Sequence, residues 1–195
     1  MKPLPLDCEA FYHANFLGIT EAEALFDHLV SGFNVTNKMI KMGDGSEQIG
    51  ALGKYLFMDP ELTSFDVFHQ VWGERSAWTD SLASVRDRIA QTTGVRFPVA
   101  RCVYYKDGTQ EMEFHRDLSA YGNTDEIASL SLGAEREFTF RRISDPAKRF
   151  TLRLAPGSLL FMGVGCQDKY EHGLLAEPQC RQARLNLTFR KYGWE

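Results

Sequence analysis

The second half of the chain is a series of short strand-like segments separated by turn residues, and this pattern restricts the fold more than any other feature. No stretch after Gly94 resembles a crossover helix, so a parallel α/β sheet is disfavoured. Many short antiparallel strands are typical of a jelly roll or a related sandwich. From Val99 onward the segments are VARCVYY, IASLSLG, EFTFRR, FTLRL, SLLFMG and RLNLTFR, with turns such as KDG and APG between them.

Two amphipathic helices are predicted before these strands. Thr20 and Glu23 form a capping box at the start of the first helix, which Gly32 closes. The second helix is expected from about Thr79 to Thr93, with Gly94 at its C′ position. The sequence therefore predicts an α+β fold, in which a double-stranded β-helix (jelly-roll) core has the N-terminal helices packed on one sheet. The apolar stripes are Ala22, Leu25, Phe26, Leu29 and Val30 in the first helix and Leu82, Val85 and Ile89 in the second.

The stretch between the two helices is rich in glycine and aromatic residues. Residues 43–78 keep neither a helical nor a strand period for long, so we expect a hairpin and loops there. No linker, repeat or low-complexity tract interrupts the sequence. We therefore expect one domain over residues 1–195.

Composition narrows the class of protein. With 195 residues, 44% hydrophobic and 25% charged, the chain has enough apolar material for one core. No apolar run is long enough to span a membrane, and the segment MKPLPLDCEAFY lacks the apolar core of a signal peptide, so we expect a cytoplasmic protein with no membrane partner. The formal net charge of −4 argues at first against a nucleic-acid partner, because phosphate binding depends on Lys and Arg.

The four cysteines form no C-x-x-C pair and are expected to be reduced. A zinc site on Cys166, His172 and Cys180 is a weak alternative, because separations of six and eight residues fit none of the usual short ligand loops.

A different set of residues has the pattern of a metal site. His115 and Asp117, two apart in an extended segment, are expected to point to the same side. A short H-x-D motif is weak alone and requires a third ligand. His172, which precedes a late strand, is the best candidate to complete a facial triad of two histidines and one carboxylate.

The last strand, RLNLTFR, has strict alternation. Arg184, Asn186, Thr188 and Arg190 are expected on the face opposite to Leu185, Leu187 and Phe189. If that polar face is exposed, the strand is simply half buried. If it faces the interior of a barrel, two buried guanidinium groups require a bound anion, and a spacing of about 20 Å leaves a gap suited to a short dicarboxylate.

Together these residues resemble the AlkB-like branch of the Fe(II)- and 2-oxoglutarate-dependent dioxygenases. The resemblance covers about Val95 to Lys191, with a looser match upstream. IASLSLGAEREFTFRR is similar to the strand pair that follows H-x-D in that family. The elements of the match are His115-x-Asp117, His172, the series R-x-N-x-T-x-R from Arg184 to Arg190, and YKDG from Tyr105, ten residues before His115.

The resemblance implies that His115, Asp117 and His172 hold Fe(II), with 2-oxoglutarate and O2 as cosubstrates. It further implies that Arg184 clamps the distal carboxylate, that Arg190 and Asn186 support the metal-side end, and that Tyr105 donates its hydroxyl to 2-oxoglutarate. In the family the reaction yields succinate and CO2, and an N-methyl group is lost as formaldehyde. About 1–98 would then supply the N-terminal helices and a substrate lid, and about 99–195 the catalytic jelly roll of an expected monomer.

Two positions depart from the family pattern. Val103 stands two residues before Tyr105, where the family usually has an Asn that contacts 2-oxoglutarate. Leu118 and Ser119 follow Asp117, where many nucleic-acid repair members carry a further carboxylate. A hydroxyl at position 119 offers no charge to favour a cationic lesion, so the identity of the substrate is less constrained than the iron chemistry.

Candidate substrate contacts lie elsewhere in the chain. The Gly50 to Trp78 stretch occupies the place of the family's lid, and Trp72 is our candidate to stack on an extruded base, although most of these rings are expected to pack in the core. The segment Ala134 to Leu154 holds six basic residues against three acidic ones, so Arg141 and Arg142 are candidates to grip a phosphate backbone or are simply solvated. The lid aromatics are Tyr55, Phe57, His69, Trp72 and Trp78.

Three functions remain open from the sequence. The first is oxidative dealkylation of N-alkylated bases in DNA, as in alkylation damage repair, with RNA as a second nucleic acid. The second is the same chemistry on RNA, protein or a small molecule, which Ser119 and the acidic net charge favour. The third is a jelly-roll module without redox activity that binds an anion on its arginine face.

Overall fold

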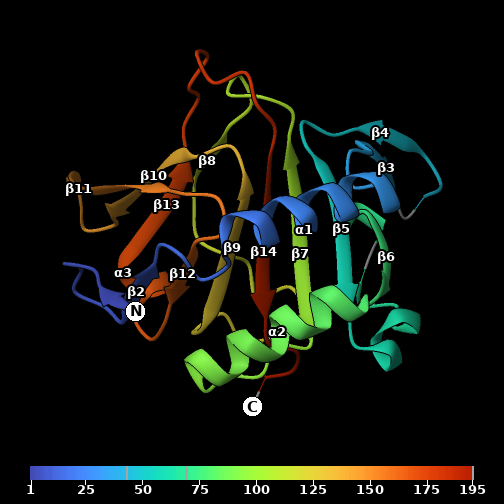
Figure 1. Cartoon of the computed structure of the whole chain (residues 1–195), viewed down its shortest axis with the longest axis horizontal. Coiled ribbons are helices and arrows are strands. Elements are labelled where there is room, and N and C mark those ends of the chain that lie inside the picture. Colours follow the sequence, from blue (N-terminus) through green and yellow to red (C-terminus); the bar gives the residue numbers. More distant parts are fainter. Residues whose placement is uncertain (43, 69, 195) are drawn as a thin grey trace.

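The computed structural model describes residues 1–42, 44–68 and 70–194. Within these residues, eight strands form the larger sheet, in the order β1-β2-β12-β9-β14-β7-β5-β6, and four form the smaller, in the order β11-β10-β13-β8. The two sheets contribute to one apolar cluster, the arrangement of a jelly roll, so the predicted α+β fold is confirmed (Figure 1).

The larger sheet draws on both halves of the chain. The predicted segments VARCVYY, IASLSLG and RLNLTFR form its three central strands and are paired antiparallel over their full length. The strands are β1 (Lys2–Pro3), β2 (Ala10–His13), β5 (Gly53–Met58), β6 (Glu74–Ala77), β7 (Val99–Tyr105), β9 (Ile127–Gly133), β12 (Leu159–Met162) and β14 (Arg184–Arg190).

The smaller sheet comes entirely from the second half of the chain. Its strands are β8 (Met112–His115), β10 (Arg136–Arg142), β11 (Asp145–Leu154) and β13 (Tyr170–Leu174). A separate hairpin pairs β3 (Met39–Lys41) with β4 (Glu47–Ile49). The helices are α1 (Ile19–Gly32), α2 (Asp80–Thr93) and α3 (Cys166–Lys169), with 3₁₀ turns at η1 (Pro60–Ser64) and η2 (Gln70–Trp72). None of the helices in the described part of the chain is long and apolar enough to cross a bilayer.

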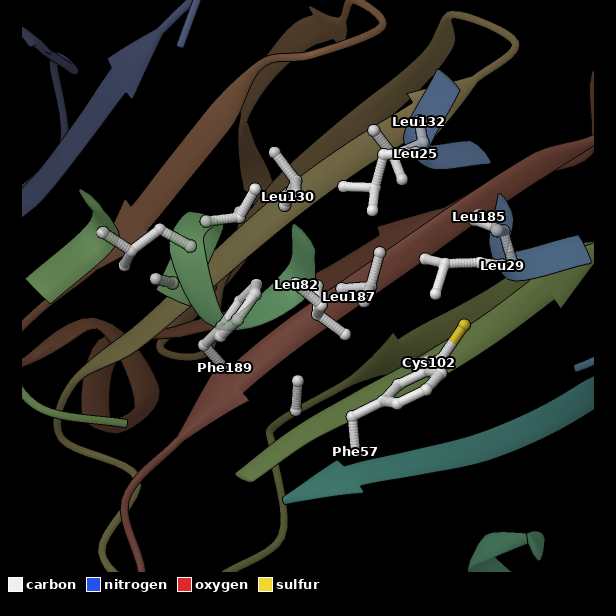
Figure 2. Close-up of a cluster of buried hydrophobic side chains, with 14 of the residues drawn as sticks. Leu25, Leu29, Phe57, Leu82, Cys102, Leu130, Leu132, Leu185, Leu187 and Phe189 are labelled. Carbon is white, nitrogen blue, oxygen red and sulfur yellow. The ribbon is translucent and has the colours of Figure 1, made fainter. Parts of the chain in front are cut away.

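Both long helices cover the same face of the larger sheet (Figure 1). Their apolar stripes pack on the outward side chains of β7, β9 and β14, as Figure 2 shows. Burial of each such leucine or phenylalanine side chain contributes about 1.5–3 kcal/mol. The labelled members of this core are Leu25, Leu29, Phe57, Leu82, Cys102, Leu130, Leu132, Leu185, Leu187 and Phe189.

The ends of α2 agree with the sequence, whereas the start of α1 does not. Thr79 caps α2 by accepting a hydrogen bond from the Leu82 backbone N–H, and Gly94 adopts the left-handed conformation at φ 77°. The predicted capping box at Thr20 is wrong, because α1 begins at Ile19 with Gly18 as its N-cap residue. The Leu17 N–H bonds to the Gly157 carbonyl, which holds the preceding chain against the loop before β12.

The stretch expected to be a hairpin and loops also contains a central strand, β5. Tyr55 and Phe57 face the helices, while Leu56 and Met58 enter an apolar cluster on the opposite face. A strand buried on both faces shows no alternation of apolar and polar residues, which explains why the sequence pattern missed it. β5 pairs parallel with β6, and residues 59–73 make the crossover between them.

Candidate metal centre and anion pocket

His115, Asp117 and His172 converge between the two sheets. His115 is the last residue of β8, and Asp117 follows two residues later, outside the strand. His172 lies within β13 rather than before a strand as we expected, and it pairs in register with His115. One nitrogen or oxygen atom from each of the three side chains lies within 4.8 Å of the other two. Two histidines and one carboxylate at this spacing match a facial triad.

The charge states of the triad suit a divalent metal. Burial lowers the pKa of His172 to about 4, so its imidazole is neutral near pH 7. Burial opposes ionisation of Asp117, but Arg190 and His172 together hold the pKa of this carboxyl below its usual range. His115 Nδ1 lies 2.7 Å from the Glu113 carbonyl oxygen, which can only accept, so Nδ1 carries the proton and Nε2 is free to bind a metal.

Asp117 is held in place by contacts from two other elements. Arg190 donates to its Oδ1, and the Asp117 backbone N–H donates to Gln167 Oε1 of α3 at 2.9 Å. Asp117 Oδ2 is buried, lies 3.5 Å from His172 Nε2, and has no hydrogen-bond partner in the described part of the chain. A buried carboxylate oxygen without a donor is costly, and a metal ion would satisfy it. The three residues therefore fit an iron centre.

Arg184 provides a separate anion site in the same cavity. It lies on β14 opposite Tyr105 of β7 and is 2% exposed. Its Nη2 donates to Ser131 Oγ at 2.9 Å, and its Nε has no partner among the described residues. Burial lowers the pKa of Arg184 to about 10, although the facing Tyr105 opposes this change. An arginine that is buried without an acidic partner is the ordinary receptor for a ligand carboxylate.

Tyr105 and Asn186 line the same cavity as Arg184 and the triad. Burial raises the pKa of Tyr105, which keeps its hydroxyl protonated and able to donate. The Asn186 amide donates to Ser129 Oγ at 2.8 Å and to the Leu130 carbonyl at 3.1 Å. Val103 is the cavity residue opposite Asn186 and adds an apolar side chain where the family has an amide.

The prediction that Arg184 and Arg190 are both free to bind an anion between them is only half right. Arg184 and Arg190 are both buried on the inward face of β14, as the alternation of RLNLTFR predicts. Arg190, however, is paired with Asp117 and also donates to the Leu118 carbonyl at 3.2 Å. Arg190 thus supports the metal side of the cavity through Asp117, and of these two arginines Arg184 is the one without an acidic partner in the described residues.

The opposite end of the cavity contains an arginine that the sequence analysis did not single out. Arg101 of β7 lines the cavity, and its Cζ lies 4.7 Å from the centroid of the Trp72 ring. Tyr121 lies beside Trp72 in an edge-on arrangement with ring centroids 6.3 Å apart. Arg101 is two positions before Val103 on the same face of the strand, and this period of two could have identified it.

Of the described lid aromatics, Trp72 contacts Arg101, a residue of the cavity lining, but does not itself line the cavity. Tyr55 and Phe57 are core residues of the helix side, and Trp78 stacks on Phe189 at 6.0 Å between centroids. Their packing follows from the position of β5 inside the sheet. His69 lies outside the described residues.

The basic segment Ala134 to Leu154 carries little free positive charge. Arg141 pairs with Glu171 at 2.5 Å, and Arg142 pairs with Asp7 at 3.1 Å. Arg136 is fully buried and pairs with Glu177, which also accepts from Arg153. The local surplus of three basic residues is thus matched by three acids from other segments, and the expected basic edge is largely neutralised.

Ser119 and the cysteines, the remaining candidate site residues, are not part of the metal centre. Ser119 is exposed and lies 3.5 Å from the Thr124 hydroxyl, outside the cavity lining. All four cysteines are free thiols. Cys166 donates to the Glu9 carbonyl and Cys180 to that of Gln182, so the alternative zinc set does not form in the described part of the chain.

Comparisons with known proteins agree with this geometry. The family model described as "2OG-Fe(II) oxygenase superfamily" matches residues 9–190, which include the triad and Arg184. In the solved structure titled "The structure of OsALKBH1", 97% of this chain and 99% of that chain align with a TM-score of 0.68 at 17% identity. At that identity the structural match concerns the fold alone.

Two curated relatives are similar in sequence. "DNA oxidative demethylase ALKBH2" of Mus musculus is 38% identical over 124 residues, covering 58% of this chain and 51% of the relative. "Alpha-ketoglutarate-dependent dioxygenase alkB homolog 3" of Rattus norvegicus is 33% identical over 122 residues, covering 58% of this chain and 41% of the relative. The match spans about half or less of each relative. The model match over nearly the whole chain makes this protein a member of the 2OG-Fe(II) oxygenase superfamily, and the triad and the nearby anion site fit that family.

Proposed function

We propose that this enzyme removes N-alkyl groups from nucleobases in DNA, as in the repair of alkylation damage, and that RNA is a second substrate to be tested. The observation that supports the proposal most strongly is the set of groups that share one cavity. Arg184, a buried arginine without an acid, and the facial triad both line it, and Trp72 packs on Arg101, a further lining residue. One relative carries the name DNA oxidative demethylase.

In this proposal the chain's own residues position three reactants. Arg184 pairs with the distal carboxylate of 2-oxoglutarate, and the protonated Tyr105 hydroxyl donates to the same molecule. Asn186 supports the metal-side end from the floor of the cavity. His115, Asp117 and His172 would hold the metal, with room left on it for the cosubstrates.

Iron and 2-oxoglutarate supply the oxidising chemistry, in which one O2 and one 2-oxoglutarate are converted to succinate and CO2 while an N-methyl group leaves as formaldehyde. The chain orients the alkylated nitrogen toward the triad and keeps bulk water away from it. Trp72 packs on Arg101, which lines the cavity, and it is our candidate to stack on an extruded base. Arg190 fixes the Asp117 carboxylate, so that one oxygen stays directed at the metal.

A panel of oligonucleotides that each carry one methylated base tests the proposal. Single- and double-stranded DNA and RNA are incubated with Fe(II), 2-oxoglutarate and the protein, and formaldehyde and succinate are measured together. We expect formaldehyde and succinate in equal amounts with at least one methylated DNA. Asp117→Ala should abolish both, whereas Glu21→Ala on the far side of the larger sheet should change neither.

The same assay separates the other classes of function. Succinate formation that no methylated oligonucleotide stimulates would assign the chemistry to a protein or small-molecule substrate. No succinate with any substrate, together with unchanged anion binding in His115→Ala, would support a binding module without redox activity. Either result would overturn the proposal.

A further inference from the structure

Arg101 occupies a position in the sheet that is costly for a cation. It pairs in register with Thr188 of β14 on one side and with Leu56 of β5 on the other, and Leu56 is completely buried. Burial and the nearby Arg190 both lower the pKa of Arg101. A leucine would fit an apolar neighbourhood of this kind without that penalty.

The donors around Arg101 are not satisfied by the protein. The Arg101 Nε is buried and has no hydrogen-bond partner within residues 1–42, 44–68 and 70–194, and no acid in those ranges forms an ion pair with this side chain. The Tyr121 hydroxyl, whose ring packs edge-on against Trp72, is also buried and unpartnered in the described chain. Unmet buried donors at a cavity point to a ligand that brings acceptor oxygens.

Arg101 lies at the end of the cavity away from Arg184, so such a ligand would bind at that end. Arg101 and Tyr105 are four residues apart on β7, about 13 Å at the usual rise of a strand. Tyr105 faces Arg184 at the 2-oxoglutarate end, whereas Arg101 stacks on Trp72 at the other end. Arg101 is therefore on the side where the proposed base enters.

We propose that Arg101 determines substrate specificity by selecting neutral N-alkylated bases that carry a ring carbonyl beside the alkylated nitrogen, in preference to cationic bases that carry an amino group there. This inference rests on the proposed function. A carbonyl oxygen accepts a hydrogen bond from a guanidinium group, whereas an amino group on a cationic ring offers only donors and a like charge.

The acids near the site do not reverse this preference. Asp117 is committed to Arg190 and to the metal, and the position that follows it by two carries the neutral Ser119. Tyr121 adds a second donor rather than an acceptor of charge, because burial raises its pKa. The described residues around Arg101 therefore offer positive charge and hydrogen-bond donors to a bound base.

Two methylated pyrimidines that differ in charge and in the exocyclic group at position 4 test the inference, and the 5-methyl group of thymine is their one further difference. 3-Methylthymine is neutral with a carbonyl at position 4, and 3-methylcytosine is cationic with an amino group there. Each is placed at the same site of one single-stranded DNA. Formaldehyde release gives kcat/KM, and fluorescence anisotropy without 2-oxoglutarate gives Kd in the absence of turnover.

We expect the wild-type protein to prefer 3-methylthymine in both measurements. Arg101→Leu should shift the ratio toward 3-methylcytosine by about 10–100-fold, and Arg101→Lys should give a smaller shift because it keeps the charge but loses the planar fork. Arg88→Leu is the matched control. Arg88 also lies over an aromatic ring, Phe16, but does so on the helix side of the sheet, so the ratio should not change.

The outcomes separate the two claims. A wild-type protein that acts on both DNAs, with a ratio that Arg101→Leu leaves unchanged, overturns the role of Arg101 and retains the proposed function. A folded Arg101→Leu protein whose sole change is a higher KM for 2-oxoglutarate also overturns it. A wild-type protein that neither binds nor demethylates either DNA overturns the proposed function and this inference with it.

Discussion

Arg190 of β14 donates to Oδ1 of Asp117 and thereby directs the other carboxylate oxygen, Oδ2, toward His172. Both side chains are 5% exposed, so this ion pair is shielded from solvent. A charge pair that is buried in this way does little for stability on balance, but it fixes geometry. Its role here is to hold one metal ligand in the orientation that the other two require.

Removal of the Arg190 guanidinium should therefore weaken metal binding. We expect Arg190→Met to lower the affinity for Fe(II) by about 10–100-fold, because Asp117 loses the donor that orients it. The affinity of Arg190→Lys for the metal should lie between those of Arg190→Met and the wild type. Calorimetric titration with Mn(II) as the probe measures the change, and an affinity equal to that of the wild type would show that Arg190 does not position the ligand.

Arg184 should affect the cosubstrate and not the metal. Arg184→Leu is expected to raise the Kd for 2-oxoglutarate by about 10–100-fold, since a carboxylate would be left without its charged partner in a dry site. The Mn(II) affinity should stay the same. Titration of 2-oxoglutarate into the Mn(II)-loaded protein is the measurement, with Arg88→Ala on the helix side as control. Equal Kd values for Arg184→Leu and wild type would argue against the clamp.

His172 should make the metal-free protein less stable in acid. The pKa of this side chain is 6.5 when unfolded and about 4 when folded, so the unfolded state binds the additional proton first as the pH falls. The stabilising contribution of neutral His172 is complete above about pH 6.5 and is lost progressively as the pH falls to about 4. Urea denaturation between pH 7.5 and 4 should show this loss, and His172→Phe should have a flatter profile. Identical slopes for the two proteins would contradict the lowered pKa.

Asp59 should be important for stability and not for catalysis. It is 4% exposed and accepts from Trp78 Nε1 at 2.7 Å, from Arg86 at 3.0 Å and from Arg96 at 2.6 Å. We expect Asp59→Ala to lower the free energy of unfolding by about 2 kcal/mol, because three donors lose one acceptor. Glu21→Ala, which breaks the more exposed pair with Arg88, should cost less than about 1 kcal/mol. Urea denaturation compares the two, and a smaller loss for Asp59→Ala than for Glu21→Ala would refute the expectation.

The sequence alone determined those features that depend on a local period or a local cap. RLNLTFR alternates strictly, so the inward direction of Arg184 and Arg190 followed from the strand repeat of two. Thr79 and Gly94 bounded α2 because capping acts within one turn of the helix. The three candidate metal ligands could be named because their residue types and order are rare in combination, although the strand positions of Asp117 and His172 were wrong in detail.

Tertiary structure alone decided the partners of these residues. Arg190 pairs with Asp117, which is 73 positions away in the sequence. Arg142 pairs with Asp7, which is 135 positions away. Such distant acids neutralise a segment that has a basic surplus when it is counted locally. β5 was hidden because burial on both faces removes alternation, and the placement of Arg101 beside Trp72 depends on the crossover that follows β5. A local pattern reports which face a side chain takes, but sheet pairing brings distant segments together and so sets which charges meet.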